Sequence, residues 1–158
     1  MSTTQSAAFL LAQIGAHAAS RYAERIAEHD LTPPQTGMLR VLRARPGMSQ
    51  QELAETLGMQ PSRVVAFVDE LEAAGYVERV RDSSDRRRNS IALTAAGKAA
   101  LRTIAVVAKA HDAEICAALT AKERATLAAL LARIADEQGL TPGVHPGYRS
   151  LRAPGARR

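Results

Sequence analysis

The hydrophobic period of the sequence changes between residues 48 and 94, from the period of a helix to that of a strand. Up to residue 74 the apolar positions recur every three or four residues, which is typical of amphipathic helices. Residues 76–80 and 90–93 are then short, apolar and β-branched, and they flank a polar stretch, which predicts a two-stranded hairpin. Few architectures join two short helices, a tight turn and a hairpin, so this stretch constrains the fold most.

Helix boundaries follow from capping residues. Thr32, Ser49 and Thr120 each stand three positions before Gln or Glu, so that each side chain of the pair satisfies an amide left free at the helix start. Thr94 caps a further long run, and glycines at positions 47, 58, 75 and 139 mark helix ends. The predicted helices cover residues 7–28, 33–43, 50–57, 61–74, 95–119 and 121–138, and residues 140–158 are expected to be an irregular tail.

The helix predicted over residues 61–74 has a buried stripe and an exposed face. The stripe follows the i, i+3, i+4, i+7 spacing and consists of Val64, Phe67, Val68 and Leu71. Near the helix start, the other face carries short, neutral or basic side chains, so this end can approach a DNA groove closely. The candidate DNA-binding residues here are Gln60, Pro61, Ser62, Arg63, Val65 and Ala66.

Several of these candidates have a chemical partner on duplex DNA. Arg63 can bond the edge of a guanine, Val65 can contact a thymine methyl group, and Ser62 can bond a base or a phosphate. Gln60 and the free amides near Pro61 can hold a phosphate. An amphipathic helix with merely solvated charges is the alternative interpretation.

The predicted hairpin carries clustered arginines. Arg79, Arg81, Arg86, Arg87 and Arg88 fall within ten residues, against Asp82 and Asp85. Like charges at a hairpin tip repel one another unless an anion lies near, and guanidinium groups are attracted to a narrow minor groove. The candidate DNA-binding residues of the hairpin are therefore Arg81, Arg86, Arg87 and Arg88, and a solvated turn is the alternative.

Residues 48–101 combine three motifs in order: the helix opening at residues 49–57, the run 64–71 followed by Gly75 and Val77, and the signature Asp85-x-Arg87 leading to Leu93-Thr94. This combination resembles the core of the multiple antibiotic resistance regulator (MarR) family, and flanking helices extend the resemblance to about residues 7–137. The bare unit would also fit other regulator families or the dimerisation domain of small-molecule methyltransferases, whose catalytic domain has no counterpart here.

The resemblance implies a mainly α fold, a winged helix-turn-helix with a two-stranded β wing flanked by N- and C-terminal dimerisation helices. The expected domain covers residues 7–137, with a DNA-binding lobe at 30–94, dimerisation helices at 7–29 and 95–137, and a basic tail at 138–158. In this family the arginine that matches Arg87 reaches the minor groove, and the aspartate that matches Asp85 supports the wing. The implied function is a transcriptional regulator, a repressor by expectation, that binds a pseudo-palindromic operator in double-stranded DNA as a homodimer.

Many members of the family respond to a small aromatic or phenolic ligand between the dimerisation helices and the DNA-binding lobe. Candidate ligand-binding residues are His17 and Arg21, one turn apart, and His111 on an apolar stripe, because cations in an apolar crevice suit a carboxylate. A role in the core or in a subunit interface is the alternative for each. Long apolar stripes on the first and last helices also favour a dimer, since one small lobe cannot cover them.

Composition excludes several other classes. The formal charge is +5, but four arginines of the tail account for most of it, since the first 137 residues hold 17 basic and 16 acidic residues. Charge interrupts every apolar stretch, so no membrane span or membrane partner is expected. With no secretory leader and a single cysteine, Cys116, the expected compartment is the cytoplasm.

No catalytic motif, cofactor or metal site is expected. His17, His29, His111 and Cys116 lack close ligand spacing, and the acids Asp69, Glu70 and Glu72 are expected to be solvated charge on a helix. Two rival functions remain: a protein-interaction module that kept the winged fold but lost DNA binding, and a sensor of a metal or an oxidant. Cys116 has no basic neighbour in sequence to form a thiolate, which argues against an oxidant sensor.

Overall fold

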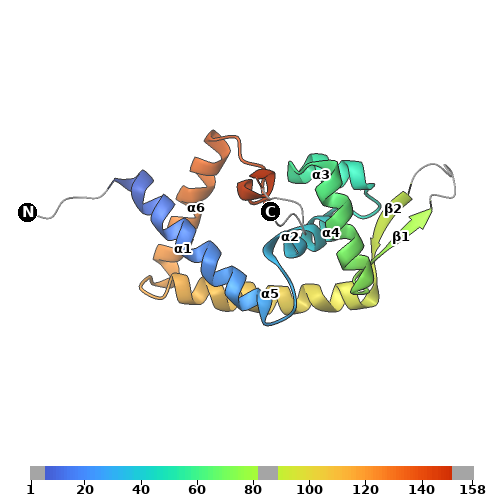
Figure 1. Cartoon of the computed structure of the whole chain (residues 1–158). Coiled ribbons are helices and arrows are strands. Elements are labelled where there is room, and N and C mark those ends of the chain that lie inside the picture. Colours follow the sequence, from blue (N-terminus) through green and yellow to red (C-terminus); the bar gives the residue numbers. More distant parts are fainter. Residues whose placement is uncertain (1–5, 82–88, 151–158) are drawn as a thin grey trace, which may run out of the picture.

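A computed structural model of the chain describes residues 6–81 and 89–150. Over these residues the protein is mainly α, with one antiparallel pair of strands, as the sequence predicts (Figure 1). The elements in chain order are α1 (Ala7–Ala27), α2 (Pro33–Ala44), α3 (Gln50–Leu57), α4 (Pro61–Ala73), β1 (Val77–Arg81), β2 (Asn89–Leu93), α5 (Ala95–Ile115), α6 (Ala121–Glu137) and a 3₁₀ turn, η1 (Pro146–Ser150).

Two of the three predicted capping boxes close in both directions, and at Thr32 only the half in which its backbone N–H donates to Gln35 Oε1 forms, at 2.9 Å. At the start of α3, the backbone N–H of Glu52 donates to Ser49 Oγ at 3.2 Å, and that of Ser49 donates to Glu52 Oε2 at 2.8 Å. The same reciprocal pair joins Thr120 and Glu123 at the start of α6. Local side-chain chemistry therefore sets where these helices begin.

Helix α5 ends at Ile115, four residues before the end predicted at Leu119. The backbone N–H of Leu119 donates instead to the carbonyl of Cys116 at 3.0 Å, in a tight turn. This turn reverses the chain so that Thr120, in an extended conformation, can cap α6. The α6 cap thus shortens α5.

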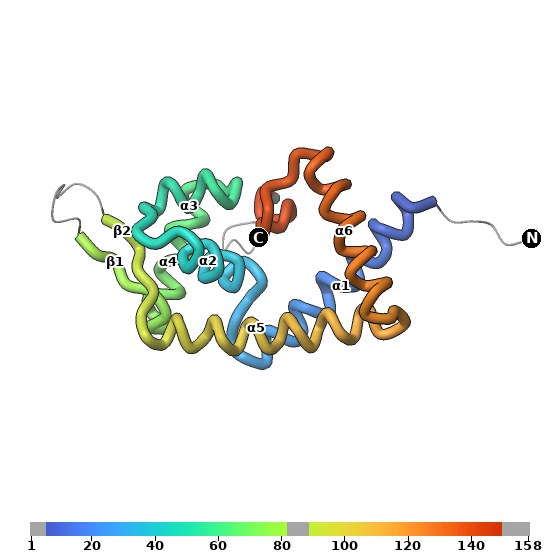
Figure 2. The backbone as a smooth tube through the Cα atoms, turned by 180° about the vertical axis from the view of Figure 1, so that it is seen from behind, coloured from blue at the N-terminus to red at the C-terminus, as the bar shows by residue number. Residues whose placement is uncertain are grey.

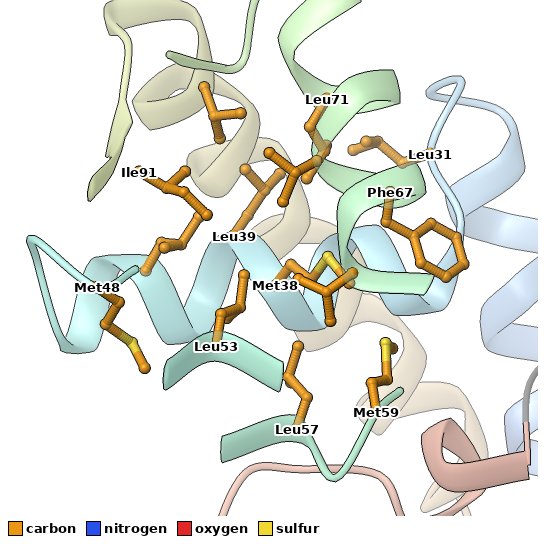
Figure 3. Close-up of a cluster of buried hydrophobic side chains, with 14 of the residues drawn as sticks. Leu31, Met38, Leu39, Met48, Leu53, Leu57, Met59, Phe67, Leu71 and Ile91 are labelled. Carbon is orange, nitrogen blue, oxygen red and sulfur yellow. The ribbon is translucent and has the colours of Figure 1, made fainter. Parts of the chain in front are cut away.

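One core lies at the centre of the winged lobe, which we define as α2, α3, α4 and the β1–β2 hairpin. Leu39 of α2, Leu53 of α3 and Leu71 of α4 meet there, each at most 1% exposed (Figure 3). The stripe predicted for α4 is confirmed, because Val64, Phe67 and Val68 are buried in the same cluster. Burying one such side chain contributes about 1.5–3 kcal/mol to folding.

The hairpin is joined to the start of α3 as well as to itself. Strand β1 pairs with β2 so that Val77 lies opposite Leu93 and Arg81 opposite Asn89. The backbone N–H of Ile91 donates to the carbonyl of Met48 at 2.8 Å, just before α3. The base of the wing is therefore held by the lobe.

Helix α5 connects the winged lobe to a second, purely helical half. Its first half packs below α2 and β2, and its second half packs against α1 (Figures 1 and 2). Leu101 and Ile104 of α5 are buried in the lobe. In both views α1 and α6 lie at the end of the molecule opposite the wing.

The chain after α6 departs from the prediction of an irregular tail. Residues 140–149, which we name the C-terminal segment, turn back from α6 toward α2 and α3, where they appear red in both views (Figures 1 and 2). Val144 and Tyr148 pack against the core, and η1 gives the segment regular structure. Contacts distant in sequence, which no local pattern reveals, hold it.

Gly97 lies where α5 meets the hairpin. A Cβ atom at this position would overlap the carbonyl oxygen of Tyr76. The same oxygen accepts a hydrogen bond from the backbone N–H of Thr94 at 3.1 Å. We therefore expect Gly97→Ala to force α5 away from the hairpin and to lower the free energy of unfolding by about 1–3 kcal/mol.

Chemical denaturation followed by circular dichroism would measure this loss. The control is Ala96→Ser, which adds one atom at an exposed neighbouring position and should change stability by less than about 0.5 kcal/mol. A Gly97→Ala protein as stable as the parent would show that the close approach is not required.

Candidate nucleic-acid interface

The turn between α3 and α4 is short, and a left-handed glycine and a backbone hydrogen bond define its conformation. Gly58 has a φ of +63°, in the left-handed region that glycine adopts without strain. The backbone N–H of Met59 then donates to the carbonyl of Ala54 at 3.0 Å, and its side chain is buried. Helix α4 starts two residues later at Pro61, a position where the missing N–H costs nothing.

The structure gathers the six predicted residues of α4 and its cap over the first two turns of this helix. Gln60, Pro61, Ser62 and Val65 are exposed, and Arg63 and Ala66 are half-buried. No bulky acid interrupts this surface, because the first acids of α4 are Asp69 and Glu70, two turns further on. The surface is therefore small and close to the helix axis, as entry into a groove requires.

Arg63 also contacts the C-terminal segment. Its Nη1 lies 3.5 Å from the carbonyl oxygen of Arg149, at the limit of a hydrogen bond. The side chain of Arg149 covers Gly58, where a Cβ atom would come within 2.8 Å of the guanidinium Nε. The C-terminal segment thus ends beside the start of α4.

Arg79 of β1 fixes the hairpin against α4. Its guanidinium forms ion pairs with Asp69 and Glu72, both on α4. Its Nε donates to Gln50 Oε1 at 3.3 Å, and its backbone N–H donates to Glu72 Oε1 at 3.1 Å. We name these four residues the Arg79 cluster, and it joins the wing, α3 and α4.

The Arg79 cluster corrects two expectations from the sequence. Arg79 does not add to the free positive charge of the wing, because both its partners are acids. Although burial opposes its charged form, the hydrogen bond to Asp69 and the charge of Glu72 raise the pKa of Arg79. Asp69 and Glu72 are likewise not merely solvated, and Glu70 accepts a hydrogen bond from Gln35 Nε2 at 3.0 Å.

The remaining wing candidates divide into two groups. Arg81 is exposed at the end of β1, opposite Asn89. Asp85, Arg86, Arg87 and Arg88 lie outside the described residues.

A crevice of about 530 Å³ lies between the winged lobe, α1, α5 and the C-terminal segment. Its volume falls in the range of small-molecule sites. Tyr22, Arg40, His111 and Tyr148 supply aromatic and polar groups to walls that are otherwise largely apolar. The rings of Tyr22 and His111 are 5.5 Å apart between centroids.

His111 is the predicted ligand candidate that lines this crevice. Its Nδ1 is buried and has no hydrogen-bond partner among the described residues. Burial, and then the charge of Arg25, lower the pKa of the imidazole, so that the neutral ring is favoured. A buried nitrogen of this kind is a ready partner for a polar ligand group.

The structure does not bring the other two ligand candidates into the crevice. Arg21 forms ion pairs with Glu24 at 2.6 Å and with Glu114 at 3.2 Å. His17 is exposed on α1. No periodic signal in the sequence points to Arg40, His145 and Tyr148, which do line the crevice.

The helical half exposes long apolar faces. On α1 these are Phe9, Leu10, Leu11 and Ile14, and on α6 they are Leu127, Leu130, Leu131 and Ile134. Ile14 is 52% exposed and Leu130 is 48% exposed in the single chain. No side chain of α6 is buried. A contiguous apolar surface of this kind marks an interface with another protein surface.

Other candidate chemistry is sparse in the described part of the chain. Cys116 is half-buried as a free thiol at the end of α5. Residues 6–81 and 89–150 contain no group of three or more His, Cys, Asp or Glu placed to hold a metal ion. None of the helices over those residues combines the length and the apolar character needed to cross a membrane.

Comparison with known proteins identifies relatives of this arrangement. The model of the MarR family matches residues 29–88, which hold α2 to β1 and the segment after it. The chain is 36% identical over 112 residues to a protein of Thauera aromatica assigned to regulation of the hcr operon, covering 71% of this chain and 68% of that protein. It is 30% identical over 129 residues to an HTH-type transcriptional repressor of Mycobacterium tuberculosis, covering 82% and 93%.

Solved structures agree with these relatives. The transcriptional repressor CouR bound to a 23-mer DNA duplex is 33% identical and has a TM-score of 0.72, over 82% of this chain and 92% of that chain. A MarR family protein of Mycobacterium tuberculosis in complex with salicylic acid is 29% identical and has a TM-score of 0.69, over 85% and 99%.

The Arg79 cluster makes a prediction about stability. Removing the guanidinium by Arg79→Ala leaves Asp69 and Glu72 close together without a cation, so we expect a loss of about 1–2 kcal/mol in the free energy of unfolding. Arg81→Ala, which removes an exposed arginine two residues away, is the control and should cost less than about 0.5 kcal/mol. Thermal denaturation at several salt concentrations would measure both, and equal losses would show that the cluster does not stabilise the wing.

Proposed function

This chain belongs to the MarR family, and we propose that it is a transcriptional repressor that binds a pseudo-palindromic operator as a homodimer and is released by a small aromatic acid. The observation that carries the proposal is that the Arg79 cluster joins α4 and the base of the hairpin side by side. In this proposal the protein binds DNA and an effector and catalyses no reaction. A role on DNA implies the cytoplasm.

In the proposed complex the start of α4 lies in the major groove. Arg63 bonds a guanine, Ser62 a base or phosphate, and Val65 a thymine methyl group. Gln60 and the amides beside Pro61 bind a phosphate, since a helix N-terminus attracts anions, and Ala66 allows close approach. The exposure of the first turns of α4 supports this assignment.

The wing lies in the adjacent minor groove. Arg81, at the end of β1, is exposed and is the wing candidate that the structure describes. We propose that Arg86, Arg87 and Arg88 bind the groove and its phosphates, and that Asp85 supports the wing. Narrow minor grooves attract guanidinium groups by their enhanced negative potential.

Two copies are needed to read a pseudo-palindrome. We propose that residues 7–29 and 95–137 form the dimerisation half and that residues 30–94 form the DNA-binding lobe. The apolar faces of α1 and α6, exposed in the single chain, support this division. Two α4 helices would then lie about 34 Å apart, one turn of DNA.

The crevice beside His111 is the proposed effector site. An aromatic ring can pack against Tyr22 and His111, while Arg40 offers a cation to a carboxylate. Arg40 forms no ion pair with another described residue, so its charge is available. The salicylic acid bound by a relative has this combination of ring and carboxylate.

Arg87→Ala tests the wing. Loss of this guanidinium should weaken binding to every duplex sequence and lower the slope of log K against log salt by about 0.9 for each phosphate that the side chain no longer neutralises. Fluorescence anisotropy with a labelled duplex across a salt series would measure the slope. The control is Lys109→Ala, on the exposed surface of α5, which should leave the slope unchanged; an Arg87→Ala protein with the parent's affinity and slope would show that the wing does not bind DNA.

Charged residues on α6 test the dimer. Leu130→Glu combined with Leu131→Glu should yield monomers, because two carboxylates would be buried in the apolar interface without partners. Light scattering would report the mass, and Val80→Glu on the wing, also an exposed apolar residue, is the matched control. A dimer that survives the change on α6 would mean that the chains associate elsewhere.

A further inference from the structure

Gly37 stands in the interior of α2, where glycine is among the least favourable residues. Its backbone is helical, so no unusual φ requires it. A Cβ atom there would come within 2.7 Å of the hydroxyl oxygen of Tyr148 and within 2.8 Å of its Cε2. The missing side chain of Gly37 therefore makes room for the ring of Tyr148.

Tyr148 is held in this place by further contacts. Its hydroxyl donates to the carbonyl oxygen of Pro33 at 3.0 Å, at the start of the same helix. Burial, and then the proximity of Tyr22, raise the pKa of the phenol, so the hydroxyl stays a donor. Val144, four residues earlier, packs against the core.

A second glycine receives the end of the C-terminal segment. The side chain of Arg149 occupies the space over Gly58, between α3 and α4. The C-terminal segment thus packs against the winged lobe at two glycines, Gly37 within α2 and Gly58 at the end of α3. Tyr148 and Arg149 are adjacent in sequence, so these two packing contacts together fix the position of η1.

The seated segment forms one wall of the crevice. Gly143, His145, Gly147 and Tyr148 line it on this side, facing Ala19 and Tyr22 of α1 and Ala108 and His111 of α5. The rings of His145 and Tyr148 lie 5.6 Å apart between centroids. Because the match to the family ends at residue 88, this wall lies outside the part of the chain that the match covers.

We propose that the C-terminal segment completes the effector pocket, with Tyr148 as a residue that contacts the ligand and determines which ligands fit. The inference rests on the proposed function. The ligand is a small aromatic acid, whose ring packs between Tyr148 and the Tyr22–His111 pair. Its carboxylate faces Arg40, which lines the same crevice as Tyr148.

Calorimetric titration of the full chain with salicylic acid and with benzoic acid tests this proposal. Tyr148→Ala should weaken binding about five- to tenfold, the loss expected for one aromatic pair. Gly37→Ala should weaken binding of the acids to a similar degree, because the added methyl group would occupy the space of the Tyr148 ring and displace it. Tyr148→Phe keeps the ring and should stay within about threefold of the parent.

Two controls test whether an effect on binding is specific to the residues of the C-terminal segment that line the crevice. Thr141→Ala changes an exposed side chain of the segment that does not line the crevice. A chain truncated after Ser150 lacks residues 151–158 but keeps the wall. Both should bind the acids as the parent does, and parental affinity in Tyr148→Ala and Gly37→Ala would overturn the proposal.

Hydrogen exchange of the unaltered protein gives an independent readout. Salicylic acid should slow exchange of the backbone amides of residues 143–149, since a ligand held by the wall stabilises it. Unchanged or faster exchange would overturn the proposal even if a substitution impaired folding.

Duplex binding, measured on the same preparation, separates two kinds of failure. A parent protein that binds duplex DNA but neither acid would refute both the effector pocket and the proposed role of the C-terminal segment in it. The proposed DNA-binding role would be unaffected. A parent that binds neither DNA nor acid would refute the proposed function itself.

Discussion

The ion pairs of Arg79 with Asp69 and Glu72 determine how the wing sits relative to α4. A two-stranded hairpin is marginally stable by itself, and one with several arginines also repels itself. In the Arg79 cluster, ion pairs with two acids of α4 neutralise one of these positive charges and hold β1 against that helix. Gln50 connects α3 to the same cluster. The base of the hairpin is thereby held against α4 in the absence of DNA, so binding does not have to bring these two elements together.

Burial is distributed very unevenly between the two halves that α5 connects. The winged lobe buries its methionines, most of its leucines and three of its valines (Val64, Val68 and Val77) in one core, whereas α6 buries no side chain in the single chain. An apolar face of this length is stable in water only when another surface covers it. Helix α5 therefore connects the winged lobe, whose core is buried in the single chain, to a half whose apolar faces are covered only in the dimer. The crevice with His111 lies where the two halves meet.

Much of this fold could be predicted from the sequence because its signals are local. The capping box of Ser49 and Glu52 lies within one helical turn, and the stripe of α4 spans two turns, so the sequence predicts both and the structure confirms them. The pairing of Arg79 with Glu72 and the seating of Tyr148 against Gly37 join separate elements, and no periodic pattern encodes them. Gly37 was the available signal, since a glycine inside a predicted helix indicates a close approach by another group. Within the candidate site, His111 lines the crevice, whereas Arg21 does not, because acids on α1 and α5 pair with it.

The central claim is that two identical reading lobes, held apart by the helical halves, match two symmetric half-sites on duplex DNA. Selection of bound sequences from a random duplex pool tests it most directly, because it reports binding and symmetry together. Two such lobes should enrich an inverted repeat whose half-sites lie about 10 base pairs apart from centre to centre. Enrichment of a single asymmetric site, or no enrichment at low salt, would contradict it.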